Sequence, residues 1–174
     1  MKDKEKAYLR VYTGDGQGKT TAAFGVLVRA LCAGKIGYVG QFVKNEIYNE
    51  VHLARFCKHV TIEQLGNGCF LDREPNELDK EAAEAALDRV AEVMKSGYYD
   101  IVVPDELTIA LHYNLLSVER VLDVIAARCP TTEVIVTGRY APQQLIDVAD
   151  LVTDMQQVKH YFEQGVLSRD GFDH

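Results

Sequence analysis

The residues best suited to chemistry form one glycine-rich segment near the N-terminus. It lies between a β-branched stretch and an amphipathic stretch and reads Thr13-Gly14-Asp15-Gly16-Gln17-Gly18-Lys19-Thr20-Thr21. Three glycines in five residues let the backbone curl until successive N–H groups converge on one anion. The N-terminus of a following helix adds the positive end of its dipole, equivalent to roughly +0.5 charge. This segment, the phosphate loop (residues 13–21), therefore predicts phosphate binding.

Two side chains extend the chemistry of the phosphate loop beyond its backbone donors. Lys19 would supply a full positive charge to terminal phosphates, and Thr20 a hydroxyl for Mg²⁺. The usual pattern G-x-x-x-x-G-K-[ST] has glycine where this chain has Thr13. The alternative is a glycine-rich turn with an incidental lysine. The expected strand before the loop and helix after it favour phosphate binding.

A second candidate group follows another apolar stretch. Residues 99–104 are followed at once by two carboxylates, Asp105 and Glu106. Proteins with a phosphate loop usually carry an acidic residue at the end of another strand, near the magnesium ion. Metal or nucleotide binding is therefore the favoured interpretation, and a solvated turn or helix start is the alternative.

The elements that must position these groups alternate along the chain. Short β-branched stretches predict strands at residues 7–12, 36–42, 60–65, 100–104 and 133–137, with a weaker sixth at 151–158. Apolar spacing near 3.6 predicts helices at residues 20–33, about 81–96 and 118–125. This order predicts an α/β fold with a mainly parallel β-sheet flanked by helices on both faces. Ligands of such sheets bind at the carboxyl ends of the strands, where both candidate groups lie.

Length, composition and charge narrow the class of protein. The 174 residues are expected to form a single domain, residues 1–174. A net charge of −7 argues against a nucleic-acid-binding protein, which would present a basic face. No apolar run approaches the ~20 residues that a membrane helix requires, so we expect a soluble cytoplasmic protein without membrane contact. The four cysteines are scattered, which disfavours a zinc ribbon and predicts buried, reduced thiols.

Motifs along most of the chain add a family resemblance. They occupy residues 14–23, 41–44, 66–68, 102–107, 137–142, 145–153 and 158–165. On these residues the chain resembles the P-loop-type ATP:corrinoid adenosyltransferases, which make adenosylcobalamin. Their phosphate loop also lacks its first glycine, and the T-G-R-x-A-P and V-K-H-x-F-x-x-G segments are more specific than the loop alone. The resemblance implies a P-loop NTPase-like (RecA-like) fold. It also implies a reaction in which the Co(I) of a corrinoid attacks the 5′ carbon of ATP and expels triphosphate.

The resemblance also implies roles for the residues of the phosphate loop and its surroundings. The backbone from Gly14 to Thr21 would bind the triphosphate of ATP, and Lys19 would stabilise the leaving group. Mg²⁺ would be held by Thr20 with Glu106, and Asp105 is the alternative metal ligand. Cobalt is the nucleophile, so no Ser, Cys or His dyad is required.

Further residues are assigned to the corrinoid or to phosphate by resemblance. Arg139 would reach a phosphate or a corrin amide, and a surface ion pair is its alternative. Lys159 and His160 would line the corrinoid site, with a structural histidine as the alternative. Gly68, Phe70 and Leu71 occupy the place where the family presents aromatic residues against the corrin. Because the chain has no Trp, Phe70 and Leu71 are expected to act as a substitute apolar wedge.

The remaining expectations concern partners and rival functions. The resemblance implies an electron donor protein that reduces Co(II), and a homodimer. The first rival is a P-loop kinase or nucleotide hydrolase, which the phosphate loop and Asp105-Glu106 alone would support equally well. The second rival is a non-catalytic sensor that binds ATP or corrinoid.

Overall fold

A six-stranded, all-parallel sheet organises the molecule in this computed structural model, which describes residues 6–43, 48–67 and 75–173. The strand order is β3-β2-β4-β5-β1-β6, and every paired neighbour runs parallel. The strands are β1 (Leu9–Thr13), β2 (Gly37–Gln41), β3 (Val60–Gln64), β4 (Ile101–Asp105), β5 (Glu133–Thr137) and β6 (Leu151–Asp154). The prediction of an α/β fold with a mainly parallel sheet is confirmed.

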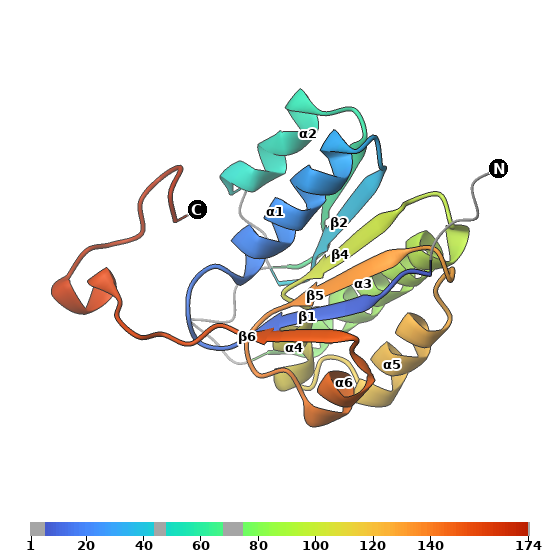
Figure 1. Ribbon diagram of the computed structural model, residues 1–174. Helices are drawn as coiled ribbons and strands as arrows, with labels where there is room; N and C mark the ends of the chain where they lie inside the picture. Colours follow the sequence, from blue (N-terminus) through green and yellow to red (C-terminus); the bar gives the residue numbers. More distant parts are fainter. Residues whose placement is uncertain (1–5, 44–47, 68–74, 174) are drawn as a thin grey trace.

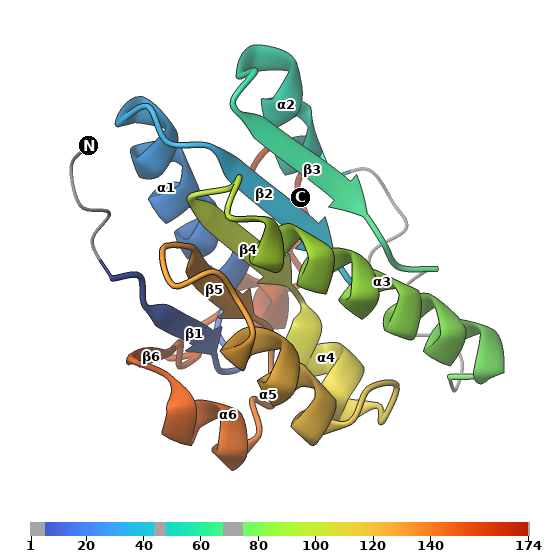
Figure 2. The same ribbon diagram turned by 90° about the vertical axis from the view of Figure 1, so that its right-hand side faces the viewer.

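The helices divide between the two faces of the sheet, as Figures 1 and 2 show. One face carries α1 (Lys19–Cys32) and α2 (Leu53–Phe56), with the 3₁₀ turn η1 (Asn49–His52) before α2. The other carries α3 (Glu77–Ser96), α4 (Leu107–His112), α5 (Val118–Ala126) and α6 (Gln143–Val148). A last 3₁₀ turn, η3 (Tyr161–Gln164), follows β6.

Apolar side chains of the central strands point alternately to the two faces of the sheet, which explains why helices cover both faces. In β4, Ile101 and Val103 pack into the apolar cluster beneath α1, whereas Val102 packs into the cluster beneath α3, α4 and α5. All three side chains are buried. A strand buried on both faces needs a continuous apolar run, because successive side chains point to opposite sides of the sheet. The apolar runs of the sequence therefore supply side chains to both apolar clusters, one on each face of the sheet.

Some helices and strands begin or end at other residues than predicted. Helix α3 begins at Glu77, four residues earlier than expected, because Asn76 and Asp79 form a capping box. The Asn76 side chain accepts hydrogen bonds from the amides of Leu78 and Asp79, and the Asp79 carboxylate accepts from the Asn76 amide. The predicted sixth strand reached residue 158, but β6 ends at Asp154. The short α2, α4 and α6 were not predicted.

Strand order brings the two candidate groups to one edge of the sheet. The phosphate loop follows β1, and Asp105 ends β4, with β5 lying between these two strands. Because all strands are parallel, their carboxyl ends share that edge. The arrangement agrees with the expected RecA-like P-loop fold.

Two other sequence expectations can be checked in the described residues. None of the described helices is both long and apolar enough to cross a membrane. Cys32, Cys57 and Cys129 are free thiols, but Cys32 is exposed and the other two are half-buried. The prediction of burial was therefore wrong for these three. Cys32 is exposed because it is the last residue of α1, beside a turn at the surface. Cys69 lies outside the described residues.

Candidate functional site

The phosphate loop lies directly against the chain that leaves β6. Gly14 and Gly18 adopt positive φ angles of 98° and 114°, a region that favours glycine. A Cβ on Gly14 would lie 2.2 Å from Asp154 Oδ1, and one on Gly16 would lie 2.7 Å from the Met155 carbonyl oxygen. The Gly16 amide donates to that carbonyl at 2.6 Å. The glycines are therefore required both for the turn and for this close approach.

Lys19 places its ammonium group inside the phosphate loop. Its Nζ donates to the carbonyl oxygens of Gly14 at 2.7 Å and Gly16 at 2.8 Å, and the residue is 8% exposed. Burial lowers the pKa of Lys19, while the nearby Glu106 carboxylate acts in the opposite direction. The charge is thus held at the centre of the loop, at the start of α1.

A buried carboxylate, Asp105, joins four elements beneath the loop. Its Oδ1 accepts hydrogen bonds from the hydroxyls of Thr20 at 2.8 Å and Thr137 at 2.7 Å. Its Oδ2 accepts from Gln41 Nε2 at 3.1 Å. Asp105 is fully buried, so this cluster fixes the direction of the Thr20 hydroxyl instead of exposing a carboxylate to a ligand.

The amide of Gln41 leaves one acceptor unused. Its Nε2 also lies 3.3 Å from Glu50 Oε1, whereas its Oε1 is buried and has no hydrogen-bond partner among the described residues. A buried acceptor without a partner is costly and is often found at a functional site. Gln41 and Thr137 were not assigned a role from the sequence. Both end strands at the carboxyl edge, which is the signal that would have identified them.

Glu106 faces the site from a strained position. It is a non-glycine residue at φ 61°, immediately before α4, and its amide donates to the Thr137 hydroxyl at 3.0 Å. Left-handed backbone of this kind costs of order 1 kcal/mol and tends to occur at functional sites. Of the two adjacent carboxylates, Asp105 is therefore enclosed in the protein and Glu106 lies at the pocket.

A pocket of about 690 Å³ gathers many of the sequence candidates. The residues that line it are Gln17, Gly18, Lys19, Thr20, Thr21, Phe24, Tyr48, Asn49, Glu50, Glu106, Arg139, Ser168, Gly171, Phe172 and Asp173. Arg139 is exposed, and it has no acidic partner within 4 Å among residues 6–43, 48–67 and 75–173. The structure thus brings residues of the phosphate loop, Glu106 and Arg139 together around one pocket.

Other candidates lie elsewhere. Lys159 and His160 line a smaller hollow of about 310 Å³ beside Gly16 and Gln17. His160 Nδ1 accepts a hydrogen bond from the Phe162 amide at 3.0 Å, which caps η3. Gly68, Phe70 and Leu71 lie outside the described residues.

The far C-terminal residues complete the pocket. Ser168 and residues 171–173 line it, although they follow the phosphate loop by about 150 positions in the chain. This exposed segment has no strong apolar periodicity and was not singled out from the sequence. Only a non-local contact could reveal it.

The loop, the buried lysine and the carboxylate-bearing strand at one edge of a parallel sheet define a P-loop nucleotide-binding protein. The fold supports this class. The structure is similar to a KaiC-like protein from the archaeon Pyrococcus horikoshii, with a TM-score of 0.51 and 18% identity, over 88% of this chain and 75% of that one.

The particular family follows from sequence comparison. Residues 5–174 match the model of the family described as ATP:corrinoid adenosyltransferase BtuR/CobO/CobP. The corrinoid adenosyltransferase of Pseudomonas aeruginosa is 38% identical over 96% of this chain and 83% of its own length. The corrinoid adenosyltransferase CobA of Salmonella typhimurium is 34% identical, over 98% and 87%. The chain therefore belongs to the ATP:corrinoid adenosyltransferase family, and the predicted enzyme class, with ATP and corrinoid as substrates, is confirmed.

Proposed function

We propose that the pocket binds ATP with its triphosphate on the phosphate loop and its 5′ carbon directed toward the Co(I) of a corrinoid substrate. The cobalt electron pair forms the Co–C bond, the C5′–O bond breaks, and triphosphate leaves with the electron pair of the C5′–O bond. The observation that carries this proposal is the buried Lys19 ammonium, which two carbonyl oxygens hold inside the glycine-rich loop at the start of α1. The protein's task is to position the two substrates and stabilise the leaving group.

Two cations of the pocket suit the leaving group. Triphosphate carries roughly −4 charge, and Lys19 is the first residue of α1, at the positive end of the helix dipole. Arg139 faces the same pocket without an acidic partner within 4 Å among the described residues. Its guanidinium is thus available to a phosphate oxygen. We assign Lys19 to leaving-group stabilisation and Arg139 to phosphate binding.

Charge balance supports Mg²⁺ as the cofactor. The lining side chains carry two cations, Lys19 and Arg139, and three carboxylates, Glu50, Glu106 and Asp173, of which Asp173 is paired with Arg169, so no cationic charge is left over for ATP. An ATP anion therefore needs a divalent cation to enter this pocket. Magnesium takes few protein ligands and keeps water and phosphate oxygens for the rest, in agreement with the absence of a three-residue metal cluster from the described part of the chain.

The donors near Thr20 fit such an ion. We assign the Thr20 hydroxyl and the Glu106 carboxylate as its ligands, with Asp105 orienting Thr20 through their 2.8 Å hydrogen bond. The unpartnered Oε1 of Gln41 offers an acceptor for a metal-bound water. When bound, the ion would neutralise charge on the triphosphate as the C5′–O bond breaks.

The remaining family-based assignments stay predictions. They are the Gly68, Phe70 and Leu71 wedge that displaces the lower ligand of the corrinoid, and contact of Lys159 and His160 with the corrinoid. An electron donor protein for Co(II) and a homodimer complete them, and a cytoplasmic location is a separate prediction from the sequence. The family membership of the chain supports the family-based assignments.

An anaerobic absorbance assay tests the proposed function. Chemically reduced Co(I) cobinamide or cobalamin is mixed with the protein, ATP and Mg²⁺. We expect a light-sensitive alkyl-cobalt spectrum with release of one triphosphate per corrinoid, and neither product without Mg²⁺. A persistent Co(I) spectrum while ATP is converted to ADP would indicate phosphoryl transfer instead.

A further inference from the structure

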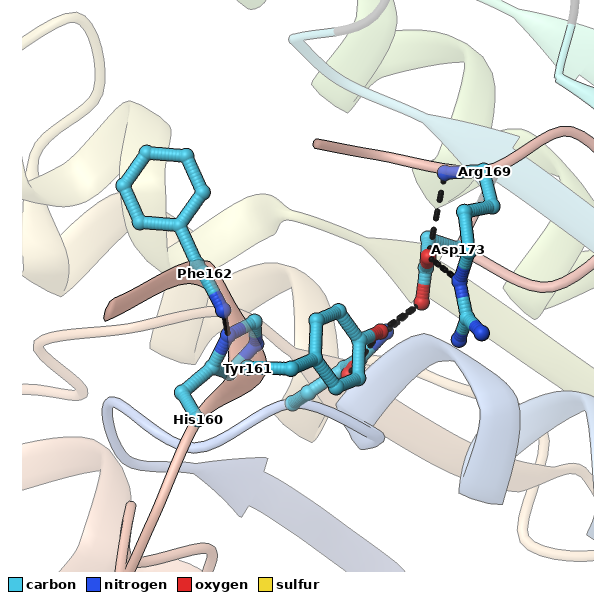
Figure 3. A network of polar contacts seen from close by, with 6 residues as sticks. His160, Tyr161, Phe162, Arg169 and Asp173 are labelled. Carbon is cyan, nitrogen blue, oxygen red and sulfur yellow. Dashed lines mark hydrogen bonds and ion pairs between the residues drawn. The ribbon is translucent and has the colours of Figure 1, made fainter. Parts of the chain in front are cut away.

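The C-terminal segment, residues 161–173, crosses to the nucleotide pocket through a defined set of polar contacts. Asp173 Oδ1 accepts from Gln17 Nε2 at 2.8 Å and also from the Tyr161 hydroxyl. Asp173 Oδ2 accepts from Arg169 Nε at 2.9 Å and from the Arg169 amide at 3.0 Å. Figure 3 shows Tyr161, Asp173 and Arg169 meeting in one cluster. The carboxylate of Asp173 thus ties the segment to the phosphate loop.

A second contact fixes the segment on the other side of the pocket. Asn49 Nδ2, in η1, donates to Asp170 Oδ1 at 2.6 Å. Asn49 and Gln17 both line the pocket, so the segment is anchored at two separate points of its rim. Between these anchors the turn containing Gly171 and Phe172 forms part of the pocket wall.

Phe172 is the apolar part of that wall. Phe172 lines the pocket yet is 81% exposed, so it contributes little to any protein core. The Arg169 guanidinium lies 5.3 Å from the centre of the Phe172 ring and 4.7 Å from that of Tyr161. A cation that lies close to both rings and is bonded to Asp173 restricts the orientation of Phe172. An oriented aromatic face beside a phosphate loop suits a planar base.

We propose that residues 168–173 are the nucleoside-binding wall of the pocket, with the Phe172 ring stacking on the purine base and Asp173 anchoring the wall to Gln17. This inference rests on the proposed function for the identity of the nucleotide. It assigns base recognition to a segment that packs on the outside of the fold. The phosphate loop then binds the triphosphate, and the wall discriminates nucleotides from inorganic phosphates.

Comparing two ligands separates the wall from the loop. Calorimetric titration of the full chain with MgATP and with Mg-triphosphate measures binding with and without a base. Stacking of one base on an aromatic side chain is worth about 1–3 kcal/mol, which corresponds to about 5- to 150-fold in affinity. We therefore expect Phe172→Ala to weaken MgATP binding by about 10-fold or more and to leave Mg-triphosphate binding unchanged.

A matched control comes from the same segment. Phe162 is 63% exposed, does not line the pocket, and points away from the Tyr161–Asp173–Arg169 cluster in Figure 3. Phe162→Ala should bind both ligands like the wild type. Asp173→Ala, which removes the anchor, should lower the affinity for MgATP relative to Mg-triphosphate, as Phe172→Ala does. Far-ultraviolet circular dichroism checks that each variant is folded.

Two outcomes would overturn the inference. One is that Phe172→Ala leaves the ratio of the MgATP and Mg-triphosphate affinities unchanged, whether neither affinity falls or both fall equally. The other is that Phe162→Ala weakens MgATP binding as much as Phe172→Ala does. The adenosyltransferase assay is a separate readout. Phe172→Ala could weaken MgATP binding as expected while the wild-type protein forms no alkyl-cobalt. That result would support the wall and contradict the proposed function.

Discussion

The surroundings of three charged side chains, Lys19, Asp105 and Glu106, differ because the backbone places each of them differently. Lys19 is enclosed by the phosphate loop, and Asp105 is enclosed by three hydrogen-bond donors. Glu106, one residue further, faces the pocket because its backbone takes a left-handed conformation. The chemical difference between two adjacent carboxylates therefore comes from one dihedral angle and from the packing around them.

Removing the Lys19 charge should mainly affect the transition state. We expect Lys19→Ala to lower the single-turnover rate from Co(I) corrinoid and ATP by on the order of 100-fold or more. Lys35→Ala is the control, because Lys35 is exposed and its nearest acidic partner is Asp100 at 3.8 Å. A Lys19→Ala rate close to that of Lys35→Ala would remove Lys19 from the mechanism.

The Asp105 cluster should be sensitive to a change of one atom. In Asp105→Asn, the negative charge is lost and one of the two oxygens that accept from Thr20, Thr137 and Gln41 becomes an NH₂ donor. Loss of this charged acceptor from a buried cluster should lower the free energy of unfolding by about 1–3 kcal/mol. Urea denaturation measures this. Asp147→Asn, at an exposed position bonded only to Gln143 in the described contacts, should cost much less, and equal costs would contradict the prediction.

Tyr140 tests the cost of left-handed backbone. It has φ 60° and stacks on His112 with ring centres 4.1 Å apart. Tyr140→Gly and Tyr140→Ala both remove this ring contact, so they differ only in the backbone preference of the new residue. We expect the glycine variant to be more stable by about 1 kcal/mol in thermal or urea unfolding. Equal stability of the two variants would show that the backbone carries no strain there.

At the scale of elements, a polar network joins β2, β3 and α3 on the sheet face opposite α1. Arg89 donates to both oxygens of Glu63, at 3.0 and 2.9 Å, and the Tyr38 hydroxyl donates to Glu63 at 2.6 Å. The Arg89 guanidinium lowers the pKa of Glu63, and burial acts against it. Burial is also the main reason why the pKa of Tyr38 is raised.

This network predicts an acid-dependent loss of stability. Because the pKa of Glu63 is lower in the folded protein, its contribution is fully present above the unfolded pKa of about 4.3 and is lost as the pH falls below it. Arg89 is partly exposed, so we expect Glu63→Gln to cost at most about 1 kcal/mol at pH 7. The cost should shrink toward zero below about pH 4. Urea denaturation across pH measures it, and a constant difference would contradict the charge-based account.

At the scale of the whole molecule, the sheet and its two cores are separate from the C-terminal segment. No residue of 161–173 is buried, whereas the apolar clusters under α1 and under α3–α5 contain the interior side chains of the strands. Stability and nucleotide recognition are therefore carried by different parts of the chain.

A truncation checks this division. Deletion of residues 161–174 should change the free energy of unfolding by less than about 1 kcal/mol, or roughly 2–4 °C in the midpoint of thermal unfolding. Leu145→Ala removes one fully buried side chain and should cost about 2–5 kcal/mol, more than the whole deletion. Calorimetry of both variants decides the matter. A larger loss from the truncation would place the segment within the folding unit.

Local physics explains what could be predicted from the sequence. Apolar periodicity depends on near neighbours, and so does the conformational freedom of Gly14 and Gly18, so the strands, the parallel fold and the phosphate loop followed from residue order. The start of α3 was missed because the Asn76 and Asp79 capping box uses shorter side chains than the Ser/Thr and Glu/Gln pair usually sought.

By itself the sequence determined the fold class, the phosphate loop and the family of this protein, because each depends on patterns and motifs of neighbouring residues. Only the tertiary structure decided that Asp105 is enclosed while Glu106 faces the pocket, and that Gln41 and Thr137 converge on Asp105. It also placed Phe172 beside the phosphate loop. These contacts join residues far apart in the chain. They follow from strand order and side-chain packing, which no local pattern specifies.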